Sequence, residues 1–490
     1  MRSENIQKSV IYRFRHLFVF ALLIALATTL ITYKFWILPN GLSAAEMASL
    51  TQSGHFSPAL LLSNFSEHLD WIVDLPWTIM QWLSLQVFGI STFALRLPAV
   101  FLGILSAVGF ILVLRKWFMT NVAMATAMLA ITSPIFISIA RSGSSSIMTV
   151  FLSVVALYAA TVILYSNSDK VGLKSLLAKV SASIAMALLL YSPGGIYLAA
   201  VFVFAGLLHP KVRLLFVRTK IWKILVGIFL GIAILAPLII GIMVQIISGD
   251  FDITREVFAL GGAMSIDNSK LFIASITGLW SGAIYGFVTP LATSVMMALA
   301  LIGLVRTCAD FFSARSYLVL PMLLAAVLLS ISNPQLLHVM VVPLILLTGT
   351  GIEVLLDHWL GLFPRNPYAR LVGAIPITIL ILSASCAAVS RYVNVVYYNT
   401  AAVYSYNQEF QATVDALQNT DGKVNVVVAD QQINLYSTLQ NASSDISVSS
   451  EFSDDATNIV VNSAKLDTTE IPQKIVTTFL SKESVLLRIY

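Results

Sequence analysis

Segments of about 20 apolar residues recur along this chain, and they constrain its fold more than any other feature. A helix of that length crosses roughly 30 Å of hydrocarbon. Only 11% of the residues are charged, whereas a soluble domain carries about 25%, so most of the surface must face lipid. We predict an all-α polytopic membrane protein with eleven spans. They cover residues 17–38, 97–114, 120–140, 146–166, 176–192, 194–209, 221–247, 281–305, 316–332, 335–356 and 371–391.

The charges of the loops predict the orientation of the spans. Lys and Arg number eighteen on the side of the N-terminus and six on the other side before residue 394. Basic loops stay in the cytoplasm. We therefore expect residues 1–16 inside and the C-terminus outside. A bacterial inner (plasma) membrane is the favoured location, with the endoplasmic reticulum as the alternative.

The segment 76–95 is the one ambiguous span. As a twelfth span it would invert everything downstream and move the basic cluster at 211–223 to the outside. We therefore favour an interfacial or re-entrant helix, with Trp77 and Trp82 at the lipid headgroups. The bundle would then have eleven to twelve helices, counting this one.

The remaining regions are predicted to lie outside the membrane. Outer loops at 39–96 and 248–280 interrupt a transmembrane domain over 17–393, and residues 394–490 form a small α/β extracytoplasmic domain. Alternation and β-branched runs in this domain predict one helix, a loop and three strands. The helix covers 403–417, the loop 441–457, and the strands 423–429, 458–462 and 484–490.

Charge and cysteine content exclude several classes of function. The net charge of +5 comes from short loops that set topology, so we expect no nucleic-acid partner. Cys308 and Cys386 lie in or beside separate apolar segments, without the spacing of a metal site or a disulfide framework. No phosphate-binding glycine loop or His-Glu-x-x-His motif is present. We predict no metal site from these patterns.

Glu46 is the first candidate for chemistry, because it follows the first span by a few residues. Ser43 and Glu46 have the spacing of a capping box, which would give Glu46 a structural role. A carboxylate at the lipid interface can also act as a general base that deprotonates an acceptor hydroxyl. Both roles can hold at once.

Three further carboxylates follow in the same outer loop. Glu67, Asp70 and Asp74 would share one face if this stretch were helical. Such a cluster could raise a pKa by mutual repulsion or bind a divalent cation, although nothing else supports a cation. The alternative is a solvated acidic face.

Arginines near the outer ends of spans are candidates for binding a lipid phosphate. Arg141 ends the third predicted span, and its guanidinium could hold a phosphate by charge-assisted hydrogen bonds. Arg96 and Arg255 are weaker candidates of the same kind. The alternative for each is an interfacial anchor.

The order of these features resembles the GT-C membrane glycosyltransferases, over residues 17–395. Specifically, the chain resembles the group that includes protein O-mannosyltransferases and aminoarabinose transferases, similar to glycosyltransferase family 39. The best stretches are Leu75-Pro76-Trp77, Phe88-Gly89-Ile90-Ser91 and Leu95-Arg96-Leu97-Pro98-Ala99, with support from Ser133-Pro134 to Arg141 and Val341-Val342-Pro343-Leu344.

The resemblance implies transfer of a hexose or amino sugar from a polyprenyl-phosphate donor. The acceptor would be a protein, a lipid or a glycan at the outer face. Glu46 would act as base, alone or with Asp74 or Asp70, and Arg141 would orient the donor phosphate. Two positions depart from the family: Ala45 replaces the first acid of its Asp-Glu pair, and residues 142–146 contain no acid.

Two alternatives remain from the sequence. A relative without catalytic activity would bind lipid-linked sugars or assist assembly, which the absent acids favour. A transporter of lipid-linked sugars would use the same outer cavity without a base, but the predicted spans contain almost none of the charges that proton coupling needs. No cofactor other than the lipid-linked donor is indicated.

Overall fold

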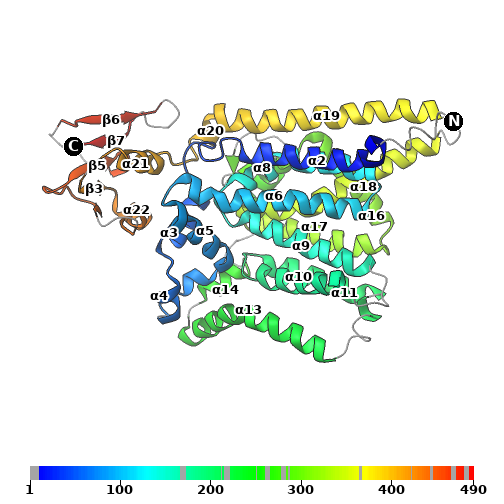
Figure 1. The fold of residues 1–490 in the computed structure, drawn as a ribbon, viewed down its shortest axis with the longest axis horizontal. Coiled ribbons are helices and arrows are strands. Elements are labelled where there is room, and N and C mark those ends of the chain that lie inside the picture. Colours follow the sequence, from blue (N-terminus) through cyan, green and yellow to red (C-terminus); the bar gives the residue numbers. More distant parts are fainter. Residues whose placement is uncertain are drawn as a thin grey trace.

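The computed structural model confirms the predicted fold class, a helical membrane domain with a small C-terminal sheet (Figure 1). It describes residues 10–63, 65–165, 173–210, 212–214, 221–249, 251–259, 265–277, 283–284, 287–362, 367–420, 422–441, 445–464, 471–478 and 485–490.

Long helices lie side by side and form the membrane bundle (Figure 1). In the described residues, six are long and apolar enough to cross a membrane, or seven if one bent pair is a single span, so this is a multi-pass integral membrane protein. Four shorter apolar helices lie at the other predicted spans. Apart from that bent pair, the helices of the bundle are α2 (Val10–Thr32), α6 (Thr92–Trp117), α9 (Ser146–Tyr165), α10 (Leu173–Leu189), α11 (Gly195–Leu208), α13 (Ile221–Ser248), α16 (Ser294–Ala309), α17 (Ala314–Ser332), α18 (Val341–Leu362) and α19 (Pro367–Tyr398).

The third predicted span is not straight. It breaks at Ser133 into α7 (Thr120–Thr132) and α8 (Pro134–Arg141), which meet at 57°. Pro134 has no N–H to continue the helix and instead begins the second segment. Every residue of α8 is buried, so Arg141 lies inside the protein and not at a lipid interface.

The span predicted at 281–305 is wrong in its first part. Residues Ala283–Ile284 (β1) and Phe287–Val288 (β2) form a short antiparallel pair, and helix α16 begins only at Ser294. Thr293 caps that helix by accepting a hydrogen bond from the Met296 amide. The sequence did not reveal where α16 begins, because a short buried strand pair and a buried helix have equally apolar compositions.

Short helices gather at one end of the bundle, close to the C-terminal sheet (Figure 1). Figure 1 labels four of them, α3 (Ala44–His55), α4 (Pro58–Ser63), α5 (Leu75–Phe88) and α14 (Asp252–Val257). The other short helices of the membrane domain are η1 (Leu69–Ile72), α15 (Ile266–Thr277) and η2 (Pro334–Met340). With 14 residues, α5 is too short to span a bilayer. The headgroup position predicted for Trp77 is wrong: its side chain is buried and donates to the Ser49 hydroxyl.

The C-terminal region is a five-stranded sheet with the order β4-β3-β5-β7-β6. β3 is parallel to β4 and β5, whereas β7 is antiparallel to β5 and β6. The strands are β3 (Val424–Val427), β4 (Ile446–Ser449), β5 (Thr457–Val461), β6 (Lys474–Thr477) and β7 (Val485–Ile489), with helices α20 (Thr400–Val403), α21 (Glu409–Leu417), η3 (Asp430–Gln432), α22 (Ile433–Gln440) and η4 (Asn462–Ala464).

The three predicted strands of this region are present, but two other predictions fail. The segment 441–457 contains β4 and is not only a loop, and the helix predicted at 403–417 begins at Glu409. The strand β4 is only partly buried, so it lacks the apolar run that revealed the others.

Two glycines allow α16 and α18 to pack closely. A Cβ added to Gly303 would overlap the Leu347 carbonyl, and one added to Gly351 would overlap the Leu299 carbonyl. Small residues at helix interfaces permit this approach in membranes.

Replacing Gly351 by Ala should therefore lower stability, because the two backbones must separate. We expect a loss of about 1–3 kcal/mol. Gly361→Ala in the same helix is the control, since a Cβ there meets nothing within 4 Å. Thermal unfolding in detergent measures both variants, and equal behaviour would show that the contact does not limit packing.

Candidate active site

A buried ion pair joins α3 to α6 at the sheet end of the bundle. Arg96 Nε donates to Glu46 Oε1 over 2.7 Å, and Nη2 donates to Oε2 over 3.2 Å. The side chains are 0% and 1% exposed. The other guanidinium hydrogens reach the carbonyls of Phe35, Pro39 and Gly41. Arg96 thereby uses all five donors and holds the loop after the first span.

Glu46 is fully engaged in structural contacts. The predicted capping box is present: Ser43 N donates to Oε2 over 2.8 Å, and Glu46 N donates to the Ser43 hydroxyl. Oε1 also accepts from Gly143 N over 2.9 Å. Burial raises the pKa of this carboxyl, but the charge of Arg96 and the hydrogen bonds together lower it by more. The pKa of Glu46 therefore lies below its ordinary value. The cavity beside Glu46 has a volume of about 10 Å³, room for one water at most.

Arg141 binds the end of the first span. Its Nη1 donates to the Leu30 carbonyl, and Nη2 donates to the carbonyls of Tyr33 and Leu38. The guanidinium also lies over the Tyr392 ring, 5.6 Å from its centroid. A cation at the C-terminal end of a helix is favoured by the helix dipole. These contacts support a structural role for Arg141.

The loop after α8 connects the ion pair to a second carboxylate. Gly143 donates to Glu46, and its carbonyl accepts from Gln81 Nε2 over 3.0 Å. Gln81 lies in α5 and also accepts from the Ser49 hydroxyl of α3. Two residues after Gly143, Ser145 interacts with the carboxylate of Asp74. The ion pair therefore fixes one wall around Asp74.

Asp74 precedes α5 in a left-handed conformation, with φ 53°. Its amide donates to the Tyr191 carbonyl over 3.0 Å, and its Oδ1 is buried without a hydrogen-bond partner. Burial raises the pKa of this carboxyl to about 7, and the negative charge of Glu256 adds to the rise, although the hydroxyls of Ser145 and Ser192 lower it. Asp74 can thus exchange a proton near neutral pH.

Acidic residues of α14 and η1 lie near Asp74. Glu256 has a raised pKa, caused first by burial and then by the charges of Asp70 and Asp252. The shared helical face predicted for Glu67, Asp70 and Asp74 is wrong, because only Asp70 lies in the short η1 and Asp74 begins another helix. Among the described residues, no group of three potential ligands could hold a metal ion.

Arg255 differs from the other two predicted phosphate ligands. Its side chain is 66% exposed and lies 3.8 Å from Asp252, whereas Arg96 and Arg141 are buried. It also neighbours Glu256 in α14, which packs against η1. Of the three arginines, it is the one whose guanidinium is accessible to an anion from outside the protein.

Sequence reasoning included Asp74 but missed its surroundings. Ser145, the adjacent pair Tyr191 and Ser192, and Glu256 come from three distant segments, and no local pattern connects them. One local signal was available: Pro76 occupies the first turn of α5, where proline is favoured, so the residue before that turn is a helix start.

Comparison with known proteins gives one family-model match and several similar solved structures. Residues 75–240, roughly a third of the chain, match the family model described as dolichyl-phosphate-mannose-protein mannosyltransferase. A comparison with curated protein sequences finds no significant match.

Solved structures of two membrane enzymes resemble most of the chain. ArnT from Cupriavidus metallidurans, bound to undecaprenyl phosphate, has a TM-score of 0.52 at 12% identity, covering 96% of this chain and 97% of its own. The oligosaccharyltransferase AglB from Archaeoglobus fulgidus, with an inhibitory peptide and dolichol phosphate, has a TM-score of 0.51 at 12% identity. That match covers 89% of this chain and 64% of AglB, so this chain spans just under two thirds of it. The expected likeness to GT-C membrane glycosyltransferases is confirmed.

Glu46→Gln should destabilise the protein, because it leaves Arg96 buried without a charged partner. Breaking a buried ion pair costs about 3–5 kcal/mol. The lowered pKa of Glu46 means that the wild-type advantage is present above pH 4.5 and is lost as pH falls. Asp310→Asn is the control: it breaks the exposed pair with Arg306 and should cost less than about 1 kcal/mol. Equal losses of thermal stability for the two variants would contradict the structural role.

Asp74→Asn should stabilise the protein at alkaline pH. The raised pKa means that ionised Asp74 is penalised in the folded state, so wild-type stability is lost as pH rises from 3.8 through about 7. Asn keeps the shape and tolerates the left-handed conformation. We expect the variant to unfold at a higher temperature than wild type at pH 8. At pH 4 the two unfolding temperatures should be equal. The exposed Asp430→Asn serves as control, and a pH-independent difference would refute the raised pKa.

Proposed function

We propose that this protein is a glycosyltransferase that moves a sugar from a polyprenyl phosphate to an acceptor hydroxyl, with Asp74 as general base. The observation that carries the proposal is the environment of Asp74. This carboxylate directly precedes the segment that matches the mannosyltransferase model, and its Oδ1 is buried and unpaired. The fold shared with ArnT supports a membrane-embedded transferase.

The proposed reaction is a displacement at the anomeric carbon of the sugar. Asp74 takes the proton of the acceptor hydroxyl while its oxygen forms a bond to that carbon. The bond from the carbon to the phosphate oxygen breaks, and the polyprenyl phosphate leaves with the electron pair. A base with a pKa of about 7 is half ionised at neutral pH and still strong enough to accept the proton.

Arg255 is the proposed partner of the donor phosphate. The leaving phosphate gains negative charge as the bond breaks, and an exposed guanidinium nearby stabilises it. The donor class is supported by the undecaprenyl phosphate and dolichol phosphate in the solved ArnT and AglB structures. The sugar is a hexose or amino sugar, and a protein, lipid or glycan supplies the acceptor.

Glu46 is a positioning residue in this proposal. To act as base it would have to leave Arg96 and the backbone amides of Ser43 and Gly143, which its low pKa opposes. It instead orients Gly143 and, through the same loop, Ser145 beside Asp74. Asp70 is exposed, and its negative charge helps to raise the pKa of Glu256. Loop charge supports an outer-face location for all of these groups.

Asp74→Asn should abolish sugar transfer while the protein remains folded. Purified protein in membranes is incubated with radiolabelled polyprenyl-phosphate sugars, and the loss of label from the lipid is followed. Wild-type activity should fall about tenfold per pH unit below pH 7, because only ionised Asp74 accepts a proton. Asp430→Asn should keep full activity.

Three results would contradict the proposal in different ways. Full activity of Asp74→Asn would remove its role as base. Loss of activity in a folded Glu46→Gln protein, with Asp74→Asn active, would return that role to Glu46. Donor binding without release from any donor would favour the non-catalytic binding or assembly role.

A further inference from the structure

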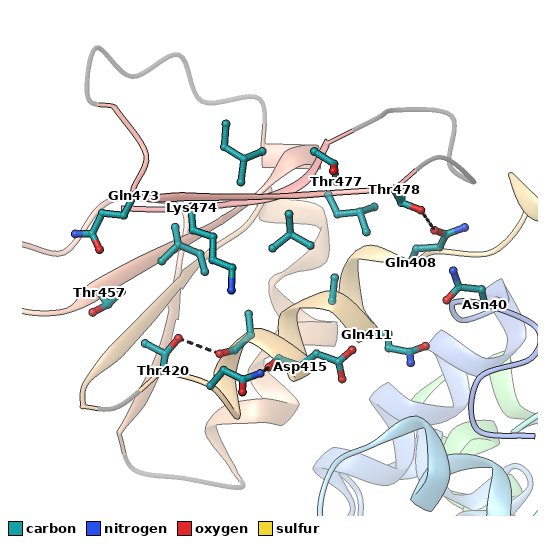
Figure 2. Close-up of a pocket in the computed structure, with 17 residues that line it drawn as sticks. Asn40, Gln408, Gln411, Asp415, Thr420, Thr457, Gln473, Lys474, Thr477 and Thr478 are labelled. Carbon is teal, nitrogen blue, oxygen red and sulfur yellow. Dashed lines mark hydrogen bonds between the residues drawn. The ribbon is translucent and has the colours of Figure 1, made fainter. Parts of the chain in front are cut away.

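A polar groove lies in the C-terminal region, away from Asp74 and its neighbours. It has a volume of about 810 Å³, within the range of ligand sites. One wall is α21, the other is formed by β6 and β7, and Asn40 of the membrane domain approaches one end (Figure 2). Nothing in the proposed chemistry uses this groove.

Side chains that both donate and accept hydrogen bonds dominate the lining. Five are amides, and four are threonines. The amides are Asn40, Gln408, Gln411, Asn419 and Gln473. Asp415 and Lys474 provide one charge of each sign, so the groove is close to neutral.

Helix α21 presents a regular row of polar groups to the groove. Gln411 and Asp415 are one helical step of four residues apart, and Asn419 lies four residues further along the chain, just beyond the end of the helix at Leu417. Such positions are separated by about 6 Å, close to the length of one monosaccharide unit. Gln411 Oε1 is buried and has no hydrogen-bond partner, so a ligand hydroxyl would satisfy it. Beneath this row, Ala412 and Ala416 provide an apolar floor.

We propose that this groove binds a neutral oligosaccharide, which serves as acceptor or as part of it. Sugar hydroxyls donate and accept, as the lining amides do, and the apolar face of a pyranose ring matches the alanine floor. A polyanionic ligand is disfavoured, because the groove offers it only the positive charge of Lys474, and the negative charge of Asp415 offsets that charge. The role of the oligosaccharide as acceptor rests on the proposed transferase function, whereas the binding of the oligosaccharide does not.

The connection to the membrane domain supports this role. Leu42 and Asn407 exchange backbone hydrogen bonds of 2.8 and 2.7 Å, which join the first outer loop to the chain just before α21. Asn40 lies between Pro39 and Gly41, whose carbonyls accept from Arg96. The groove is therefore fixed relative to the ion pair that orients the candidate active site.

Direct binding to the full-length protein tests the inference without any donor. Maltotriose, cellotriose, mannotriose and triacetylchitotriose are titrated in nanodiscs, with a neutral Ser/Thr hexapeptide for comparison, and saturation-transfer NMR gives Kd. We expect at least one trisaccharide to bind at about 1 mM or tighter. Gln411→Ala should weaken it about fivefold through a lost hydrogen bond, and Ala416→Trp should abolish it by filling the floor.

The control is Gln431→Ala, an exposed amide outside the groove, which should bind as wild type does. The inference is overturned if no trisaccharide binds, if only the hexapeptide binds, or if Ala416→Trp binds a trisaccharide as tightly as wild type. Because this experiment measures binding and not transfer, a negative result would not bear on the role of Asp74, which the transfer assay tests separately. Trisaccharide binding with no transferase activity would instead refute only the proposed function.

Discussion

The pairing of Arg96 with Glu46 is the constraint on which the sheet end of this molecule depends. Two charges withdrawn from water are tolerated only when each finds full compensation. Here the carboxylate is compensated by the guanidinium, the Ser43 amide and the Gly143 amide. The guanidinium is completed by three carbonyls of the loop after the first span. One interaction thus joins α3, α6, that loop and the loop after α8, which otherwise share no continuous secondary structure.

Two acids near the same end of the bundle have pKa values shifted in opposite directions, because only one of them is paired with a cation. Glu46 has a cation and several donors, and its pKa is lowered, whereas Asp74 is buried beside other acids and its pKa is raised to about 7. Environments that separate the pKa values of similar groups mark a division of roles. The first acid holds the architecture, and the second is suited to proton transfer. A raised pKa also carries a stability cost, which functional sites commonly bear.

Much of the fold could be predicted because lipid imposes a simple rule on sequence. Every predicted span overlaps an apolar helix or a bent pair, since length and hydropathy reveal where such helices lie, although they do not fix where each one begins. The break at Ser133 and the strand pair before α16 were not predicted, because tertiary contacts and not hydropathy decide them. Within the candidate site, the capping box of Glu46 is local and was predicted, but Arg96 lies fifty residues away and its role was not. The groups that act on Asp74 are Ser145, Ser192 and Glu256 of α14, which only the folded chain brings together.

The short bridge between Leu42 and Asn407 limits how the C-terminal sheet can move. Gly41, with φ +93°, passes so close that an added Cβ would lie 2.6 Å from the Asn407 carbonyl oxygen. A swing of the sheet about this point would break both bridge hydrogen bonds and disturb the carbonyls that Arg96 holds. The sheet and the first outer loop should therefore travel as one rigid unit. Any rearrangement that admits a large substrate must then leave the junction between this loop and the sheet intact.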